Sequence, residues 1–111
     1  MHNRSYFVYI LSNKQRTVLY TGVTNDIEQR IIEHYRNRGQ DKSFTGRYHV
    51  YYLLYYEQHQ YINNAIARET EIKKWNRLKK MKLIGAFNPG LEFLNERLFG
   101  CWPPKEQPSR L

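Results

Sequence analysis

The sequence predicts an α+β domain, a small three-stranded antiparallel sheet flanked by helices. Two β-rich runs near the start are separated by a short polar link, as in a hairpin, and a third tyrosine-rich run is followed by helical sequence. No internal repeat and no linker divides the 111 residues. We therefore expect one domain over residues 1–99 and a flexible tail over residues 100–111, which holds three of the four prolines.

The first two strands are expected to pair as a hairpin. Residues 5–12 are β-branched and aromatic and end at an Asn-Lys-Gln link, and residues 17–23 form the returning strand. Within the first strand, Tyr9 and Leu11 point to the same face because side chains alternate. Gly22, near the end of the second strand, indicates a bend or a close approach to the backbone.

A helix is expected over residues 26–38, with Asn25 and Glu28 as its N-terminal capping pair. Its apolar face consists of Ile27, Ile31 and Tyr35. A polar loop over residues 39–47 then leads to a third strand over residues 49–57. That strand is nearly continuous in apolar and aromatic residues, which predicts a central position or cover on both faces.

The next helix, over residues 61–75, carries a carboxylate in an unexpected place. Its apolar stripe consists of Ile62, Ala65, Ile66 and Ile72. Glu69 falls near the middle of that stripe. Burying an ionised carboxylate costs several kcal/mol unless something compensates its charge. We expect the partner to be either a cation of the chain, Arg30 or Lys73, or a bound divalent metal.

Helical sequence continues toward Ile84, breaks at Asn88-Pro89-Gly90, and resumes in a last helix over residues 90–98. The chain has 18 Lys and Arg against 10 Asp and Glu, a net charge of +8. The positive electrostatic field of such a chain favours the binding of polyanions, although a net charge of this size also promotes solubility. The basic side chains expected to contact nucleic acid are Lys73, Lys74, Arg77, Lys79 and Lys80.

The composition also limits the cellular compartment and the kinds of site that the protein can have. A single cysteine, Cys101, excludes an internal disulfide and indicates a reducing compartment. No apolar run approaches the roughly 20 residues that span a bilayer, and no signal peptide is visible. The His and Cys residues lack the spacing of a zinc site. We expect a cytoplasmic protein without a membrane partner.

Four polar side chains in the first half of the chain complement Glu69: Tyr9, Tyr20, Arg30 and His34. Arg30 and His34 lie four residues apart and share a helix face at the edge of the apolar stripe. Arginine can bind a phosphate with two hydrogen bonds. Each residue also has a structural alternative: a solvated arginine, two core tyrosines and a half-buried histidine. As a set, they suit the cleavage of a phosphodiester.

In this order the residues resemble the GIY-YIG nuclease family. Phe7-Val8-Tyr9 stands where that family has its first tripeptide, and Tyr20-Thr21-Gly22 stands where it has the second. Arg30 follows Gly22 by eight residues, at the place of the family's helix arginine, and His34 follows one turn later. In the first tripeptide only the tyrosine matches the family's pattern, with Phe7 and Val8 in place of Gly and Ile.

The resemblance extends over roughly residues 5–98. Glu69 matches the family's metal-binding glutamate, and Asn88 resembles the asparagine that closes the family module and would support the site, as would Gly22. The chain looks most like the small stand-alone members, which are described as excinuclease C-subunit-like. We expect no attached domain of the kind that larger members carry, and hence a protein partner or a homodimer.

The resemblance implies hydrolysis of a DNA phosphodiester with a single Mg²⁺ or Mn²⁺ held by Glu69. Tyr9 would be the general base or would position the water, and a base role requires a pKa lowered from about 10 by a nearby cation. Tyr20 would support the phosphate, Arg30 would stabilise transition-state charge, and His34 would assist positioning or proton transfer. Repair or recombination is the expected setting, and RNA is not excluded. The alternatives are a non-catalytic nucleic-acid-binding module and a protein-interaction adaptor.

Overall fold

The computed structural model describes residues 5–104. It contains the strands β1 (Tyr6–Ser12), β2 (Leu19–Thr24) and β3 (Tyr52–His59), and the helices α1 (Ile27–Arg36), α2 (Phe44–Arg47), α3 (Ile62–Lys73), α4 (Arg77–Phe87) and α5 (Asn95–Phe99). The strands form one antiparallel sheet in the order β2-β1-β3. The predicted α+β fold with a three-stranded antiparallel sheet is therefore confirmed.

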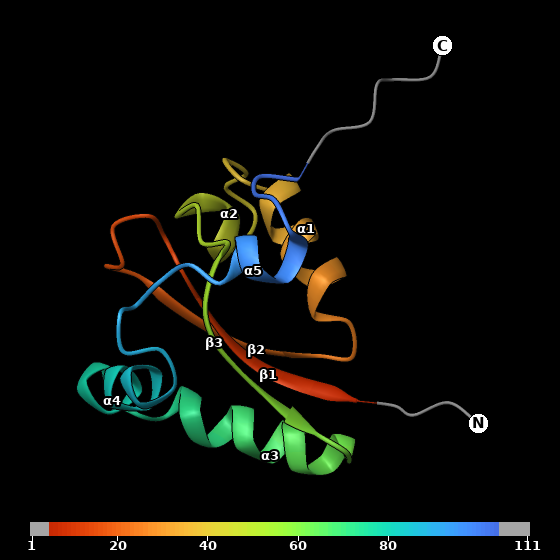
Figure 1. Cartoon of the computed structure of the whole chain (residues 1–111), viewed down its shortest axis with the longest axis vertical. Helices are drawn as coiled ribbons and strands as arrows, with labels where there is room; N and C mark the ends of the chain where they lie inside the picture. Colours follow the sequence, from red (N-terminus) through yellow and green to blue (C-terminus); the bar gives the residue numbers. More distant parts are fainter. Residues whose placement is uncertain (1–4, 105–111) are drawn as a thin grey trace.

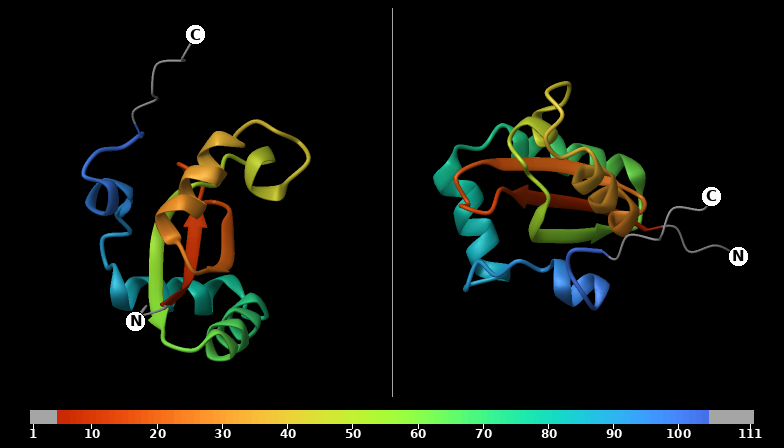
Figure 2. Two further views of the ribbon diagram at one scale, coloured as in Figure 1. Left: turned by 90° about the vertical axis from the view of Figure 1, so that its right-hand side faces the viewer. Right: turned by 90° about the horizontal axis from the view of Figure 1, so that it is seen from above.

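Helices cover both faces of the sheet (Figure 1; Figure 2). α3 and α4 pack on one face, where Val8 and Ile10 of β1 are buried. α1 and the segment that leads into α5 pack on the other face, with Tyr9 and Leu11. The expected alternation along β1 is confirmed, and it assigns Tyr9 to the α1 face because side chains alternate along a strand.

β1 is the central strand, and β3 lies at an edge of the sheet. The apolar sequence of β3 is instead explained by cover on both faces, since Leu53 packs on the α1 side and Leu54 on the α3 side. The register against β1 shifts between Ile10 and Leu11, which is the signature of a β-bulge. Because of the bulge, Leu54 and its neighbour Tyr55 belong to the same core cluster.

Two buried asparagines tie the C-terminal segment to this edge strand. Asn88 Nδ2 donates to the Leu54 carbonyl at 3.0 Å and to the Glu92 carbonyl at 2.8 Å. Asn95 Oδ1 accepts from the Leu53 backbone N–H at 2.7 Å. Buried backbone groups that a sheet leaves unpaired must find partners elsewhere, and these side chains supply them. Asn95 had no signal in the sequence, because its partner lies 42 residues away.

Several helix boundaries differ from prediction. Asp26, not Asn25, caps α1, because its side chain accepts from the Gln29 N–H at 3.1 Å. The polar loop over residues 39–47 contains α2, which Ser43 caps. The last helix is α5, which is shorter and begins later than predicted.

The long basic helical stretch is two helices rather than one. α3 ends at Lys73, and Asn76 caps α4 by accepting from the Lys79 N–H at 2.9 Å. Asparagine is a preferred N-cap residue because its side-chain oxygen satisfies a free backbone N–H. The break lets α4 run in its own direction at one end of the sheet (Figure 1).

The predicted tail begins at residue 100, but the described residues 100–104 still pack on the domain. The Trp102 ring lies 5.2 Å from the Tyr35 ring of α1 and 5.3 Å from the Phe99 ring. Residues 105–111 of the predicted tail lie outside the described residues. Among residues 5–104, no helix is long and apolar enough to cross a membrane.

Candidate active site

The site is built around Tyr9, whose ring lies over Gly22 of the neighbouring strand. The two residues are directly paired in the β1–β2 ladder. A Cβ atom at residue 22 would lie 2.4 Å from the Tyr9 hydroxyl oxygen and 2.5 Å from Cζ, well inside van der Waals contact. Only glycine leaves room for this ring. The predicted close approach at Gly22 is confirmed, and Tyr9 is the group that approaches.

α1 brings His34 to the Tyr9 hydroxyl. The Tyr9 oxygen lies 3.2 Å from His34 Nε2, and His34 Nδ1 lies 2.9 Å from the Thr45 hydroxyl of α2. Both His34 and Thr45 are buried. Thr45 was missed from the sequence, because the contact depends on how α2 folds back against α1.

Burial controls the protonation of this pair. Burial, assisted by the positive charge of Arg30, lowers the pKa of His34 to about 4, so the imidazole is neutral at pH 7. Burial also raises the pKa of Tyr9 to about 12. The lowered pKa that a tyrosine base requires is therefore not found. We assign the Tyr9 hydroxyl as donor to Nε2 and the Nδ1–H as donor to Thr45.

Opposing charges flank the Tyr9 hydroxyl. Burial is the largest cause of the raised pKa of Tyr9, followed by the neighbouring Tyr20. The negative charge of Glu69 also raises this pKa, whereas Arg30 lowers it. The Tyr20 ring lies 6.3 Å from the Tyr9 ring and 5.4 Å from the His34 ring. The structure therefore brings together all five side chains of the predicted constellation, from β1, β2, α1 and α3.

Arg30 is neither buried nor free in solvent. Its guanidinium donates to Glu33 at 2.9 Å, and its side chain is partly exposed. Burial acts to lower the pKa of Arg30, but hydrogen bonds with Glu33 and Tyr9 outweigh it and raise that pKa. A guanidinium held on one side by Glu33 and open to solvent on another is suited to receive an anion.

Glu69 is mostly shielded, although the predicted apolar stripe is only half correct. Ile62 and Ile66 are 48% and 46% exposed, whereas Ala65 and Ile72 are buried. The buried line of α3 thus runs on either side of Glu69, whose side chain is 17% exposed. Its partner among the predicted cations is Lys73, at 3.1 Å, and not Arg30.

A divalent metal would have Glu69 as its protein ligand. Within residues 5–104, no three His, Cys, Asp or Glu side chains gather into a metal site. The Glu69 carboxylate fits Mg²⁺ or Mn²⁺ all the same, because it is a hard oxygen donor and its present partner, Lys73, is half exposed to solvent. Mg²⁺ often takes one carboxylate together with water and substrate phosphate.

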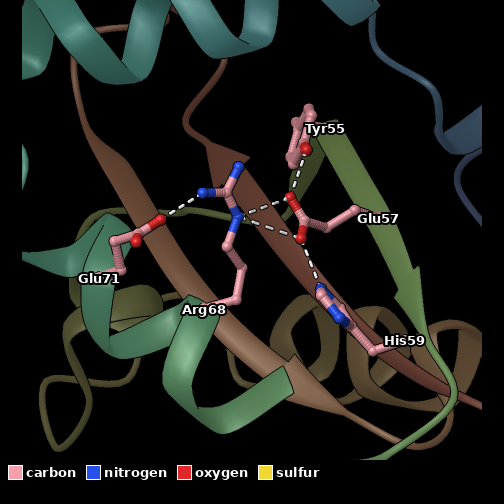
Figure 3. Close-up of polar contacts among 5 residues, drawn as sticks. All are labelled: Tyr55, Glu57, His59, Arg68 and Glu71. Atoms are coloured by element: carbon pink, nitrogen blue, oxygen red, sulfur yellow. Dashed lines mark hydrogen bonds and ion pairs between the residues drawn. The ribbon is translucent and has the colours of Figure 1, made fainter. Parts of the chain in front are cut away.

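A second polar cluster fixes the position of α3 (Figure 3). Glu57 of β3 accepts from Arg68 Nε at 3.1 Å, and it also contacts Tyr55 and His59, each at 2.5 Å. Burial acts to raise the pKa of Glu57, but these hydrogen bonds lower it, so the carboxylate stays charged. Arg68 directly precedes Glu69, so the Arg68–Glu57 pair ties α3 to β3 next to Glu69.

The predicted nucleic-acid contacts are only partly near this cluster. Lys73 is next to Glu69, but α4 packs on the face of the sheet opposite α1 (Figure 1). Arg77 donates to the Thr17 and Arg16 carbonyls at the hairpin turn. Lys79 lies 4.4 Å from the Trp75 ring. Arg77 thus stabilises the packing of α4 on the hairpin turn. The basic side chains of α4 lie on the other side of the sheet from the Tyr9 hydroxyl.

Known proteins resemble this chain along most of its length. The family model described as the GIY-YIG catalytic domain matches residues 5–82. A UPF0213 protein of Staphylococcus saprophyticus is 42% identical over 79 residues, which cover 71% of this chain and 93% of that protein. A UPF0213 protein of Staphylococcus aureus is 39% identical over 80 residues, which cover 72% of this chain and 94% of that protein. The solution NMR structure of a UPF0213 protein from Bacillus halodurans superimposes with a TM-score of 0.51 at 29% identity, covering 83% of this chain and 95% of that one.

Replacing Gly22 with alanine is expected to lower the free energy of unfolding by about 1–3 kcal/mol, because the new Cβ overlaps a buried ring that cannot move aside. Gly85→Ala is the matched control. Nothing lies within 4 Å of a Cβ at residue 85 of α4, so alanine should leave stability unchanged or raise it by up to about 1 kcal/mol. Urea unfolding measures both, and equal effects would contradict the packing of Tyr9 on Gly22.

The stability of the protein should depend on pH through His34. Its pKa is about 4 in the folded protein against about 6.5 when unfolded, so between these values the unfolded chain binds more protons. Stability attributable to His34 is complete above pH 6.5 and is lost as pH falls toward 4, by up to about 3 kcal/mol. The free energy of unfolding of wild type should therefore fall more steeply over this range than that of His34→Gln. Parallel curves would show that His34 is not held neutral.

Proposed function

From the premise that this chain belongs to the GIY-YIG family, a nuclease family, we propose that it is a metal-dependent endonuclease that hydrolyses DNA phosphodiester bonds. One observation carries the proposal: the Tyr9 hydroxyl contacts a neutral imidazole at 3.2 Å and is acted on by the opposite charges of a guanidinium and a shielded carboxylate. These groups meet the needs of phosphodiester hydrolysis, which are to hold the phosphate, to handle a proton and to offset developing charge.

Arg30 is proposed to receive the scissile phosphate. It stays cationic at any working pH, and its hydrogen bond to Glu33 leaves it preorganised rather than freely rotating. Charge that develops on the phosphoryl oxygens in the transition state would be offset by this guanidinium without further reorganisation. Tyr20, whose ring neighbours both Tyr9 and His34, would support the same phosphate.

Tyr9 is proposed to position the attacking water, to accept the proton of that water and to pass its own hydroxyl proton to His34. With a pKa of about 12, Tyr9 keeps its proton until it can deliver it along the existing hydrogen bond to Nε2. A pKa of about 4 makes His34 a weak base in the free protein. Bound phosphate would raise that pKa, because a nearby negative charge favours the imidazolium form. The base would therefore become effective when substrate is present.

Glu69 is proposed to hold one Mg²⁺ or Mn²⁺, which when bound supplies Lewis acidity at the phosphate. The carboxylate would exchange Lys73 for the ion and leave the lysine to contact the substrate strand. Asn88 would support the site only through the fold, because its side chain bonds the backbone of Leu54 and Glu92. The proposed location is the cytoplasm, and the proposed process is DNA repair or recombination. RNA as the substrate, and action with a protein partner or as a homodimer, are alternatives to test.

A catalytically weak nucleic-acid-binding module is the second candidate. Two observations favour it: the net charge of +8 and the raised pKa of Tyr9, which opposes a tyrosine base. Such a module would bind DNA with strong salt dependence and would not turn over in any divalent metal.

Glu69→Gln is expected to reduce cleavage of end-labelled duplex, flap and branched DNA by at least about 100-fold in Mg²⁺ and Mn²⁺, because the metal loses its protein ligand. DNA affinity and fold should be retained. Glu71→Gln is the matched control on the same helix, since Glu71 is exposed and pairs with Arg68, and it should cleave as wild type does.

The outcomes separate the two candidates. Wild-type activity in Glu69→Gln overturns the metal assignment. Binding without cleavage by wild type on every substrate and in both metals favours the binding module.

A further inference from the structure

A row of three aromatic rings, which we call the aromatic row, leads from the candidate active site to the surface. It consists of Tyr20, Phe44 and Tyr48. The Phe44 ring lies 6.4 Å from the Tyr20 ring with the two planes 27° apart, and the Tyr48 ring follows at 5.0 Å. Phe44 is 50% exposed and Tyr48 is 45% exposed. Single exposed rings are common, but a contiguous row that begins at a site indicates an interaction surface.

The row is held in place by α2. Thr45, between the two outer rings in sequence, is buried and bonds His34 at 2.9 Å. The Ser43 side chain accepts from the Gly46 N–H at 3.0 Å. Gly46 itself packs so closely that a Cβ there would lie 2.6 Å from the Asn37 carbonyl oxygen. Because the segment is fixed to α1, a ligand that stacks on the rings would lose little binding free energy to ordering them.

The charge around the row identifies the class of ligand. Residues 36–47 contain one acidic residue, Asp41, and four basic ones: Arg36, Arg38, Lys42 and Arg47. Asp41 lies 3.9 Å from Arg47, which leaves an excess of positive charge. Exposed aromatic rings within a basic surface are the features that bind single-stranded nucleic acid, through stacking on bases and attraction of phosphates.

We propose that Phe44 and Tyr48 stack an unpaired base of the substrate strand, next to the phosphate that Arg30 receives. The inference rests on the proposed endonuclease function and narrows its substrate class. A base inside a duplex has both of its faces covered by neighbours, so only an unpaired, terminal or extruded base can lie on Phe44. The preferred substrates are thus single strands, flaps and branch points rather than intact duplex.

Binding of fluorescent oligonucleotides in EDTA tests the stacking without cleavage. Phe44→Ala is expected to weaken binding of a single strand on the order of 10-fold, with a much smaller change for a long blunt duplex, whose terminal bases are few among its internal ones. Phe44→Trp, which keeps a stacking ring, should retain wild-type affinity. Tyr61→Ala is the matched control, because Tyr61 is 63% exposed at the start of α3, away from α2 (Figure 1), and it should change neither affinity.

An abasic site walked along the single strand gives a second measurement. At the nucleotide that stacks, removing the base should weaken binding to wild type but not to Phe44→Ala, because the two changes delete the same contact. Equal losses in both proteins at every position overturn the inference, as does an equal effect of Phe44→Ala on single strand and duplex.

These results can be told apart from a failure of the proposed function. Selective binding through Phe44 with no cleavage in Mg²⁺ or Mn²⁺ supports the stacking surface and counts against the endonuclease. Cleavage with unchanged binding by Phe44→Ala does the opposite. No binding of either oligonucleotide by wild type overturns both.

Discussion

The space above Gly22 is the constraint on which the site depends. Because residue 22 has no side chain, the Tyr9 ring lies across the neighbouring strand and its hydroxyl reaches His34. That contact, continued to Thr45, joins β1, α1 and α2 into one buried hydrogen-bonded path. Buried polar groups are stable only when they are satisfied, so the three side chains specify one another's positions. A larger residue at position 22 would disturb all of them together.

Electrostatics then separates this site from an ordinary core. A core tyrosine needs no charged neighbours, whereas Tyr9 has Arg30 and Glu69 acting on it in opposite directions. Arg30 comes from α1 and Glu69 from α3, on opposite faces of the sheet. The contact between Arg68 and Glu57 ties α3 to β3 next to Glu69. Opposite charges that act on one buried hydroxyl are more typical of a functional site than of a hydrophobic core.

Local patterns were enough to predict the strands, the face of β1 that holds Tyr9 and the close approach at Gly22, because each follows from side-chain alternation or backbone sterics. Features that depend on tertiary packing were not predictable. The edge position of β3, the hydrogen bond of Thr45 and the half-exposed stripe of α3 all follow from how distant segments meet. A base role for Tyr9 would require a lowered pKa, and burial raises that pKa instead.

The most direct test of the account is single-turnover cleavage of a flap substrate in Mn²⁺ by wild type and by Tyr9→Phe. Phenylalanine keeps the ring over Gly22 but removes the hydroxyl that His34 contacts. The account predicts that DNA binding persists while cleavage falls by about 100-fold or more. Wild-type cleavage by Tyr9→Phe, or no cleavage by either protein, would contradict it.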